Sequence, residues 1–349
     1  MRCTLLQGPG GAAAPGPAPR MPQDLRRQVL EDVLWADMEA RPPPSQLPLL
    51  AHYTSILTLE RIAQTGEIWF SNPLYMNDVD ELRYGMNLGL HAVRSHAGLR
   101  EACPPAHYNA LLDAFDALYT AFDGESAFDV YVFSCSEHDD EIGDDGLLSM
   151  WRGYGGDGNG VAIVFDVSPL LTPDSPLLVR QVQYHSYEQS EAWMDRKLQA
   201  FAEALRRAGG PVEGMQDAAA ALFERIKVFA LFTKHRGFHE EREWRLVYLR
   251  EQDRLGVLTQ RLNYAIGPRG IEPRLRFTTD ALAGAGQVPG QGPSLQQMVR
   301  RIILGPVLAT PLALRSVERM LEIYQPVWAD RVARSSTPYR SQRMPWPIT

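Results

Sequence analysis

The stretch at residues 233–248, TKHRGFHEEREWRLVY, places the strongest constraint on the fold. Residues 244–248 carry apolar side chains at every second position, which predicts a half-buried β-strand. Glu241 and Glu243 stand two positions apart where this strand begins, so their carboxylates should share one face, with about 6–7 Å between the Cα atoms. Such a pair suits chemistry that removes a proton or stabilises a developing positive charge. The alternative is a solvated, charge-rich turn before an ordinary strand.

Composition narrows the class of protein. With 349 residues, 45% hydrophobic and 22% charged, the chain can bury a substantial core in one large domain or two modest ones. A net charge of −7 argues against an extended basic face for duplex nucleic acid. Cys3, Cys103 and Cys135 have no close pairing and no metal-ligand spacing, which is typical of a reducing compartment. No apolar run reaches the length of a membrane span and no secretory signal is present, so we expect a cytoplasmic protein without a membrane partner.

Glycine- and proline-rich segments divide the chain. We expect a disordered tail, a helix with a proline linker, a single α+β domain and a loose C-terminal tail, at residues 1–20, 21–45, 46–325 and 326–349 respectively. Met1 and Met21 are alternative starts of the natural chain.

The domain body alternates strand and helix patterns. Strands are expected at residues 49–53, 67–71, 129–136, 161–165, 179–184, 244–248 and 299–304, with weak extension at 276–278. Helices are expected at residues 57–64, 76–96, 107–122, 188–207, 215–232 and 311–324. Strands at both ends with helices between them predict a mixed α+β fold whose sheet is assembled from distant segments. The acidic segment 137–145 is expected to be a solvated loop, with a hard-cation site as the alternative.

Five short pieces occur in order along this body: His52-Tyr53-Thr54-Ser55, Trp69-Phe70-Ser71-Asn72-Pro73, Met150-Trp151 with Tyr154, Glu241-x-Glu243-Trp244-Arg245, and Ile303-Leu304-Gly305-Pro306. Their combination resembles the bacterial domain of unknown function family 2971. The resemblance covers roughly residues 47–324 and implies little about mechanism.

A more distant resemblance carries more chemistry. His52-x-Thr54, a helix, Gly66 and a second strand are similar to the first motif of ADP-ribosyltransferases of the His-Tyr-Glu type. In this resemblance Glu243 matches the acid of the third motif, and Glu241 matches the extra acid of members that modify side chains. It implies an ADP-ribosyltransferase-like split β-sheet core with inserted helices, and NAD as a substrate.

The second-motif aromatic stays open between Tyr75 and Tyr154. Ser71 resembles the first serine of the Ser-Thr-Ser motif of the other branch of these enzymes, whose threonine and second serine are missing here. The resemblance therefore implies that NAD is held by the following residues: His52, Thr54, Ser71, Tyr75, Tyr154 and Arg245.

Cleavage of the nicotinamide–ribose bond creates an oxocarbenium-like ribose, as glycoside hydrolysis does. Glu243 is expected to stabilise this cation, while Glu241 orients or deprotonates the acceptor. We therefore predict an NAD-dependent ADP-ribosyltransferase that needs no metal. Its acceptor is unknown: a protein, a nucleic acid or water.

Two other functions remain open. His235, His239 and Glu243 are spaced by four and would align as metal ligands of a hydrolase or nuclease on a helix, although Gly237 breaks that helix. A non-enzymatic module that binds a nucleotide or a partner in the same pocket would have almost the same sequence. For His52, a satisfied structural histidine is the simpler interpretation.

Overall fold

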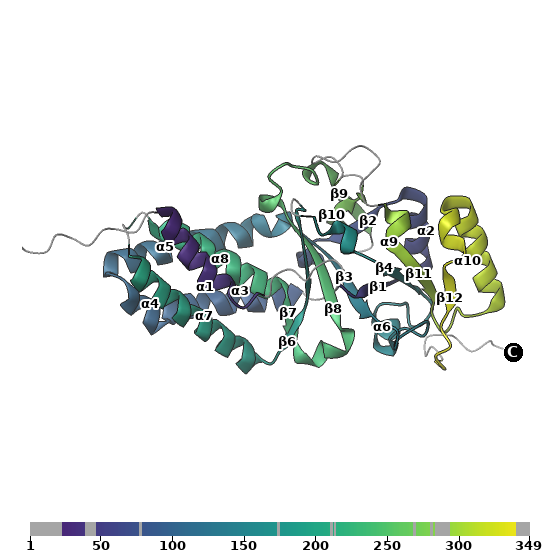
Figure 1. Ribbon diagram of the computed structural model, residues 1–349, viewed down its shortest axis with the longest axis horizontal. Coiled ribbons are helices and arrows are strands. Elements are labelled where there is room, and N and C mark those ends of the chain that lie inside the picture. The colour runs from purple at the N-terminus through teal and green to yellow at the C-terminus, as the bar shows by residue number, and fades with distance from the viewer. Residues whose placement is uncertain are drawn as a thin grey trace, which may run out of the picture.

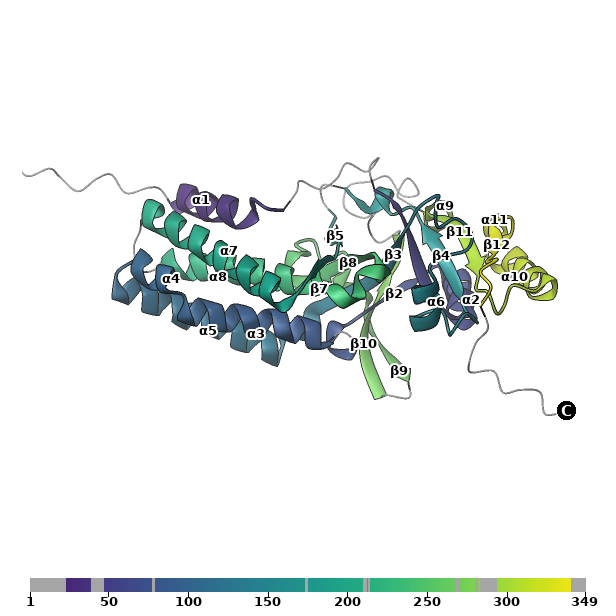
Figure 2. The ribbon, with the colours of Figure 1, turned by 90° about the horizontal axis from the view of Figure 1, so that it is seen from below.

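The computed structural model describes residues 23–38, 47–76, 79–172, 175–209, 212, 214–267, 270–279, 282 and 294–339. The protein is a mixed α+β structure in which a mostly antiparallel sheet separates a helical bundle from a smaller group of helices (Figures 1 and 2). The expected tail at residues 1–20, the proline linker and the loop at 283–293 lie outside the described residues.

The bundle consists of six helices: α1 (Gln23–Trp35), α3 (Val79–Ser95), α4 (Ala97–Ala102), α5 (Pro105–Gly124), α7 (Tyr187–Ala208) and α8 (Gly214–Leu231). Helix α8 contacts α1, α3 and α5, and most of its residues are buried. A helix that is apolar on nearly every side belongs in the middle of such a bundle. Its last turn leads into the segment that contains the two candidate acids.

The main sheet contains ten strands: β1 (Leu49–Thr54), β2 (Ile68–Ser71), β3 (Val130–His138), β4 (Val161–Phe165), β5 (Leu177–Gln181), β8 (Glu243–Leu249), β9 (Leu262–Gly267), β10 (Gly270–Phe277), β11 (Val299–Leu304) and β12 (Val332–Arg334). The main path runs β12-β11-β4-β1-β3-β2-β10-β9, and β8 pairs with both β3 and β5. A separate parallel pair joins β6 (Gln183–His185) to β7 (Thr233–His235).

Strand β3 is where the sheet divides. Strand β8 pairs with it from Val130 to Ser136, while β1 pairs with it only from Ser136 to His138. Strand β2 meets it at a single described position, Ser71 opposite Val132. Because β8 occupies one edge throughout, β1 and β2 share the other edge and diverge there. The sheet therefore opens beside residues 133–135.

Strand β8 is buried on both faces, so the expected half-buried strand is wrong in this respect. Val247 and Leu249 pack into the core of the helical bundle, whereas Leu246 and Tyr248 pack into the core on the other side of the sheet. The side chains of β8 do alternate between two faces, but the second face of the strand packs against helices and is not exposed to water.

The second group of helices covers the far side. Helix α2 (Ile56–Thr65) begins at Ser55, whose hydroxyl accepts from the Thr58 amide, and ends at Gly66 with φ +68°. With it on this face lie α9 (Leu295–Met298), α10 (Pro311–Tyr324) and α11 (Pro326–Ala329). Helix α6 (Leu148–Gly153) packs on the opposite face of β1 and β4 through Met150 and Trp151. The segment expected to be a loose tail forms α11 and β12, and Trp328 is fully buried.

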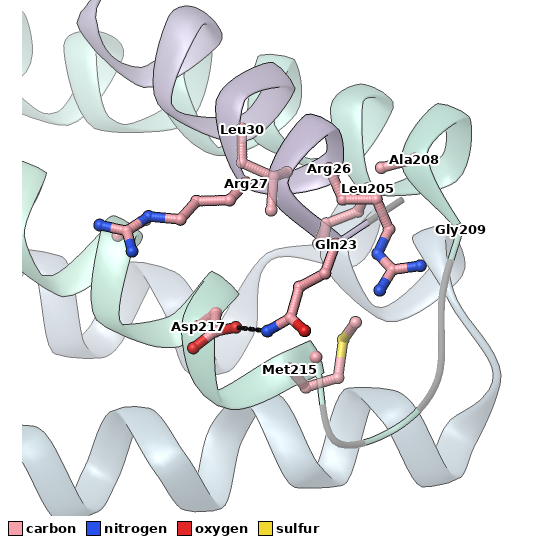
Figure 3. Close-up of a pocket in the computed structure, with 11 residues that line it drawn as sticks. Gln23, Arg26, Arg27, Leu30, Leu205, Ala208, Gly209, Met215 and Asp217 are labelled. Atoms are coloured by element: carbon pink, nitrogen blue, oxygen red, sulfur yellow. Dashed lines mark hydrogen bonds between the residues drawn. The ribbon is translucent and has the colours of Figure 1, made fainter. Parts of the chain in front are cut away.

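Helix α1 lies across α7 and α8 (Figure 3). Gln23 Nε2 donates to Asp217 Oδ2 over 2.9 Å, and beside this bond remains a cavity of about 20 Å³. A space of that size holds about one water molecule, so it is a packing seam.

Among the described helices, none is long and apolar enough to cross a membrane.

Candidate active site

A pocket of about 180 Å³ lies where the sheet divides. Five of the residues that the sequence analysis assigned to the site line it: His52, Ser71, Tyr154, Glu241 and Glu243. They come from β1, β2, the end of α6, the 3₁₀-helix Arg236–Glu241 and the beginning of β8, so the divergence of the strands brings distant segments together.

Glu243 is the innermost acid, with 5% of its surface exposed. Arg245 donates to both of its oxygens, from Nε to Oε1 over 2.7 Å and from Nη2 to Oε2 over 3.0 Å. Lys234 Nζ lies 3.4 Å from Oε2. Burial alone would raise the pKa of Glu243, but the charges of Arg245 and Lys234 outweigh it and hold the pKa below its ordinary value of 4.5. Glu243 is therefore a fixed negative charge.

Glu241 is the acid with a freer approach from the pocket. Its side chain keeps 13% of its surface exposed, against 6% for that of Glu243. Lys234 Nζ donates to its Oε2 over 2.8 Å, and the Tyr154 hydroxyl donates to its Oε1 over 3.1 Å. A ligand that enters the pocket can thus reach Glu241 by displacing one phenol.

The backbone before β8 is turned sharply. A 3₁₀-helix, Arg236–Glu241, ends at Arg242, which has φ +46° although it is not glycine. Its guanidinium binds Glu137 and Asp139, each over 2.8 Å, and these ion pairs hold the turn. The Tyr184 hydroxyl accepts from the Glu243 amide over 2.7 Å, and burial raises the pKa of this phenol to about 12. Strained backbone of this kind often accompanies functional sites.

His52 bridges the opening of the sheet. Its Nδ1 lies 2.9 Å from the carbonyl oxygen of Ser134, at a position where β1 has already left β3. Since a carbonyl only accepts, Nδ1 carries the proton and Nε2 is left with a lone pair. Burial lowers the pKa of His52, so the ring is neutral at pH 7. The histidine therefore has a structural bond, as the simpler interpretation expected, and one acceptor nitrogen to spare.

Cys135 also lines the pocket. Burial, reinforced by the charge of Glu243, raises the pKa of its thiol well above 9.0. The thiol stays protonated at neutral pH, which makes it unsuitable as a nucleophile.

The remaining assigned residues lie outside the pocket lining. Thr54 pairs with Val161 at the end of β1. Tyr75 contacts the ring of Phe128, so of the two aromatic candidates only Tyr154 lines the pocket. Arg245 lies behind Glu243, and its Nη1 donates to the carbonyl of Leu231 over 2.7 Å.

The acids of segment 137–145 are not simply solvated. Besides the pairs with Arg242, Asp144 forms an ion pair with Arg301, and Asp145 accepts from the amide and hydroxyl of Ser336. The expectation of a solvated loop missed these pairs because their partners lie roughly a hundred or more residues away.

The spacing of His235, His239 and Glu243 does not produce a ligand set. His235 belongs to β7 and its Nδ1 accepts from the Gly237 amide, while His239 Nδ1 contacts the carbonyl of Arg236. Across the described ranges, no three His, Cys, Asp or Glu side chains converge in a way that could hold a metal ion. The continuous helix that would align these three side chains as metal ligands is not formed.

The sequence analysis did not find the group that joins the two acids. Lys234 is 2% exposed and contacts both carboxylates. Its position a few residues before the two acids was the available signal. Tyr184 gave no signal, because it precedes Glu243 by 59 positions.

Comparison with known families identifies one segment. Residues 150–246 match the family described as Protein of unknown function (DUF2971). The DUF2971 segment runs from α6 to β8 and contains Tyr154, Glu241 and Glu243, but not His52 or Ser71. It supports the family resemblance drawn from the ordered motifs. Searches of curated proteins and of solved structures give no match.

Proposed function

We propose that this protein is an NAD-dependent ADP-ribosyltransferase whose substrate enters the pocket at the divergence of β1 and β2. One observation carries the proposal: two carboxylates, a neutral histidine, a serine and a tyrosine from five separate elements line a single pocket. Such convergence of polar groups in a concave site is what binding and catalysis require.

The chemistry follows from the charges. When the bond between nicotinamide and ribose C1′ breaks, its electron pair leaves with nicotinamide and positive charge develops on the ribose. Glu243, held ionised by Arg245, supplies a fixed negative charge that needs no reorganisation. Glu241 accepts a hydrogen bond from the ribose or from the acceptor after the Tyr154 hydroxyl is displaced. The acceptor then bonds to C1′ and loses its proton.

The size of the pocket limits how NAD binds. About 180 Å³ is below the range of about 300–1,000 Å³ of sites that enclose a whole small molecule. The pocket therefore takes the nicotinamide end, and the rest of the dinucleotide lies outside it. His52 Nε2 and the Ser71 hydroxyl are the groups available to its sugar hydroxyls.

The test is nicotinamide release from NAD, measured by chromatography with and without cell lysate as a source of acceptor. Glu241→Gln keeps the size of the side chain and should lower the rate about 100-fold or more. Glu240→Gln, an exposed neighbour in the same turn, is the matched control and should keep the wild-type rate. No release by the wild type under either condition, together with no NAD binding, would refute the proposal.

A binding module without turnover is the second candidate. It is favoured by the pairing of both acids with Lys234 and Arg245, which reduces the net negative charge that faces a cation. In that case the wild type binds NAD without releasing nicotinamide, and Glu241→Gln changes only the affinity.

A further inference from the structure

A second, larger cavity of about 440 Å³ lies on the other side of Lys234. It is enclosed by α3, the N-terminal ends of α7 and β7, the C-terminal end of α8, and the 3₁₀-helix. Its volume falls within the range of about 300–1,000 Å³ typical of small-molecule sites. Nothing in the proposed transferase chemistry uses it.

Aromatic rings form one wall of this cavity. Tyr84 and Tyr187 contact each other edge-on with ring centroids 5.1 Å apart, and Tyr187 contacts His235 at 5.2 Å. Phe238 adds another ring, and both Tyr187 and Phe238 are largely exposed, at 58% and 44%. Exposed aromatic rings gathered around a cavity favour a planar ligand that can stack on them.

The floor of the cavity is rigid and unusually close-packed. A Cβ at Gly85 would lie 2.7 Å from Cβ of Ala230, so α3 and α8 touch there through their backbones. Both residues line the cavity. Because the two helices are locked together at this crossing, the space above them cannot be filled by a small adjustment of the bundle.

His185 provides a polar contact that the protein leaves unused. Its Nδ1 is buried, and within the part of the chain that the structure describes no group bonds to it. A buried ring nitrogen without a partner loses the hydrogen bond that it would make in water. His185 also lines the cavity, so a ligand with a ring N–H or carbonyl can restore that bond once the ring turns to present the nitrogen to it, because a neutral imidazole nitrogen serves as donor or acceptor.

The charges around the cavity are already paired by the protein. Lys234 contacts Glu241 and Glu243, and Glu81 lies 3.7 Å from Arg245. Lys234, which lines the cavity, is thus already neutralised by two carboxylates, so a neutral ligand is favoured over a phosphate.

We propose that this cavity is a separate binding site for a neutral, planar heteroaromatic molecule of nucleoside size, which stacks on Tyr187 and hydrogen-bonds to His185. The site is independent of the proposed transferase function. Its occupant contacts Lys234 from the side opposite to the two acids.

Adenosine is a suitable probe, and calorimetric titration of the full chain measures its binding. The wild type should bind one equivalent. Tyr187→Ala should weaken binding about tenfold or more, since loss of one stacking ring typically has this effect. Tyr187 is exposed, so its removal leaves the core intact. His185→Phe keeps a planar ring of similar shape, removes the hydrogen bond and should also weaken binding.

Two controls locate the site. Tyr264→Ala, at a tyrosine that is 66% exposed on β9, should bind adenosine as the wild type does. Tyr154→Phe, in the smaller pocket, should also leave adenosine binding unchanged. Wild-type affinity in both Tyr187→Ala and His185→Phe, or no binding by the wild type, would overturn the proposal. Much tighter binding of AMP than of adenosine would overturn the neutral ligand class.

Discussion

At the scale of single residues, the stretch that dominates the sequence is a buried ionic network. Lys234, Glu241, Glu243 and Arg245 contact one another at the beginning of β8, and three of them are 6% exposed or less. Buried charges are stable only when each is paired and hydrogen-bonded. The interleaving of acids and bases in the sequence is therefore explained by pairing, and of the two acids Glu241 keeps the freer approach from the pocket.

Glu243→Gln should destabilise the fold at neutral pH by about 3–5 kcal/mol, because it removes the nearer carboxylate from the buried Arg245 guanidinium and leaves the more distant Glu81, at 3.7 Å, beside it. The folded-state pKa of Glu243 is depressed, so its stabilisation is present above its ordinary pKa of 4.5 and is lost as the pH falls through the folded-state value. The difference between wild type and variant should thus shrink as the pH is lowered below 4.5. Urea unfolding of both proteins between pH 7 and pH 4 measures this.

The control for this pair is Glu240→Gln, which should unfold with wild-type stability at every pH because its side chain is exposed. A constant difference between wild type and Glu243→Gln over the whole pH range would contradict the assignment of an ionised, paired carboxylate.

At the scale of elements, the glycine-rich loop at residues 155–160 acts as a crossing point. A Cβ on Gly160 would lie 2.3 Å from the carbonyl oxygen of Thr54, and one on Gly305 would lie 2.5 Å from that of Gly158. The ends of β1 and β11 therefore meet the beginning of β4 backbone against backbone. Gly160 and the loop around Gly158 thus serve the close approach of these backbones.

Gly160→Ala should lower the free energy of unfolding by about 1–3 kcal/mol, since the backbone of Thr54 must move to admit a methyl group. Gly153→Ala is the matched control: it lies at the end of α6 with nothing within 4 Å of its Cβ position, so it should be neutral or slightly stabilising. Thermal unfolding of the two variants compares them directly. Equal melting temperatures would show that the crossing tolerates a side chain.

At the scale of the whole molecule, local sequence patterns predicted where helices and strands begin and end. They predicted less well what surrounds each helix or strand. Strands β4 and β11 and helix α10 begin and end where the sequence placed them, because each has strong periodicity and clear end signals. Of the hairpin β9–β10 only weak extension at residues 276–278 was predicted, since Pro273 interrupts β10 and Tyr264 and Ile266 of β9 are exposed.

The candidate site could be predicted only in part, because some of its residues have a local sequence signal while their meeting is long-range. Glu241 and Glu243 are visible as a local pair, and His52 and Ser71 occur in motif-like positions at strand ends. Their meeting depends on how β1 and β2 part from β3, which is a long-range property of the sheet. The role of Tyr184 depends on another long-range pairing, that of β6 with β7.

The ion pairs that hold α1 in the bundle lead to a last prediction. This helix is held through Asp37, just beyond its end, by Arg225 and Lys197 from α8 and α7. The Arg225 side chain is 5% exposed, its Nε donates to the carbonyl of Leu34, and its guanidinium lies 4.4 Å from the ring centre of Trp193. One cation thus joins three helices.

Arg225→Gln should release α1 from the bundle, because it removes one of the two cations that bind Asp37, together with the cation–π contact to Trp193. Limited proteolysis should then cut within or next to α1 much faster than in the wild type, before the rest of the chain is digested. Arg27→Gln, which removes only an exposed ion pair with Glu31 on α1 itself, should leave the cleavage rate unchanged. If both variants resist the protease as the wild type does, the apolar contacts of Leu30 and Leu34 alone hold the helix in place.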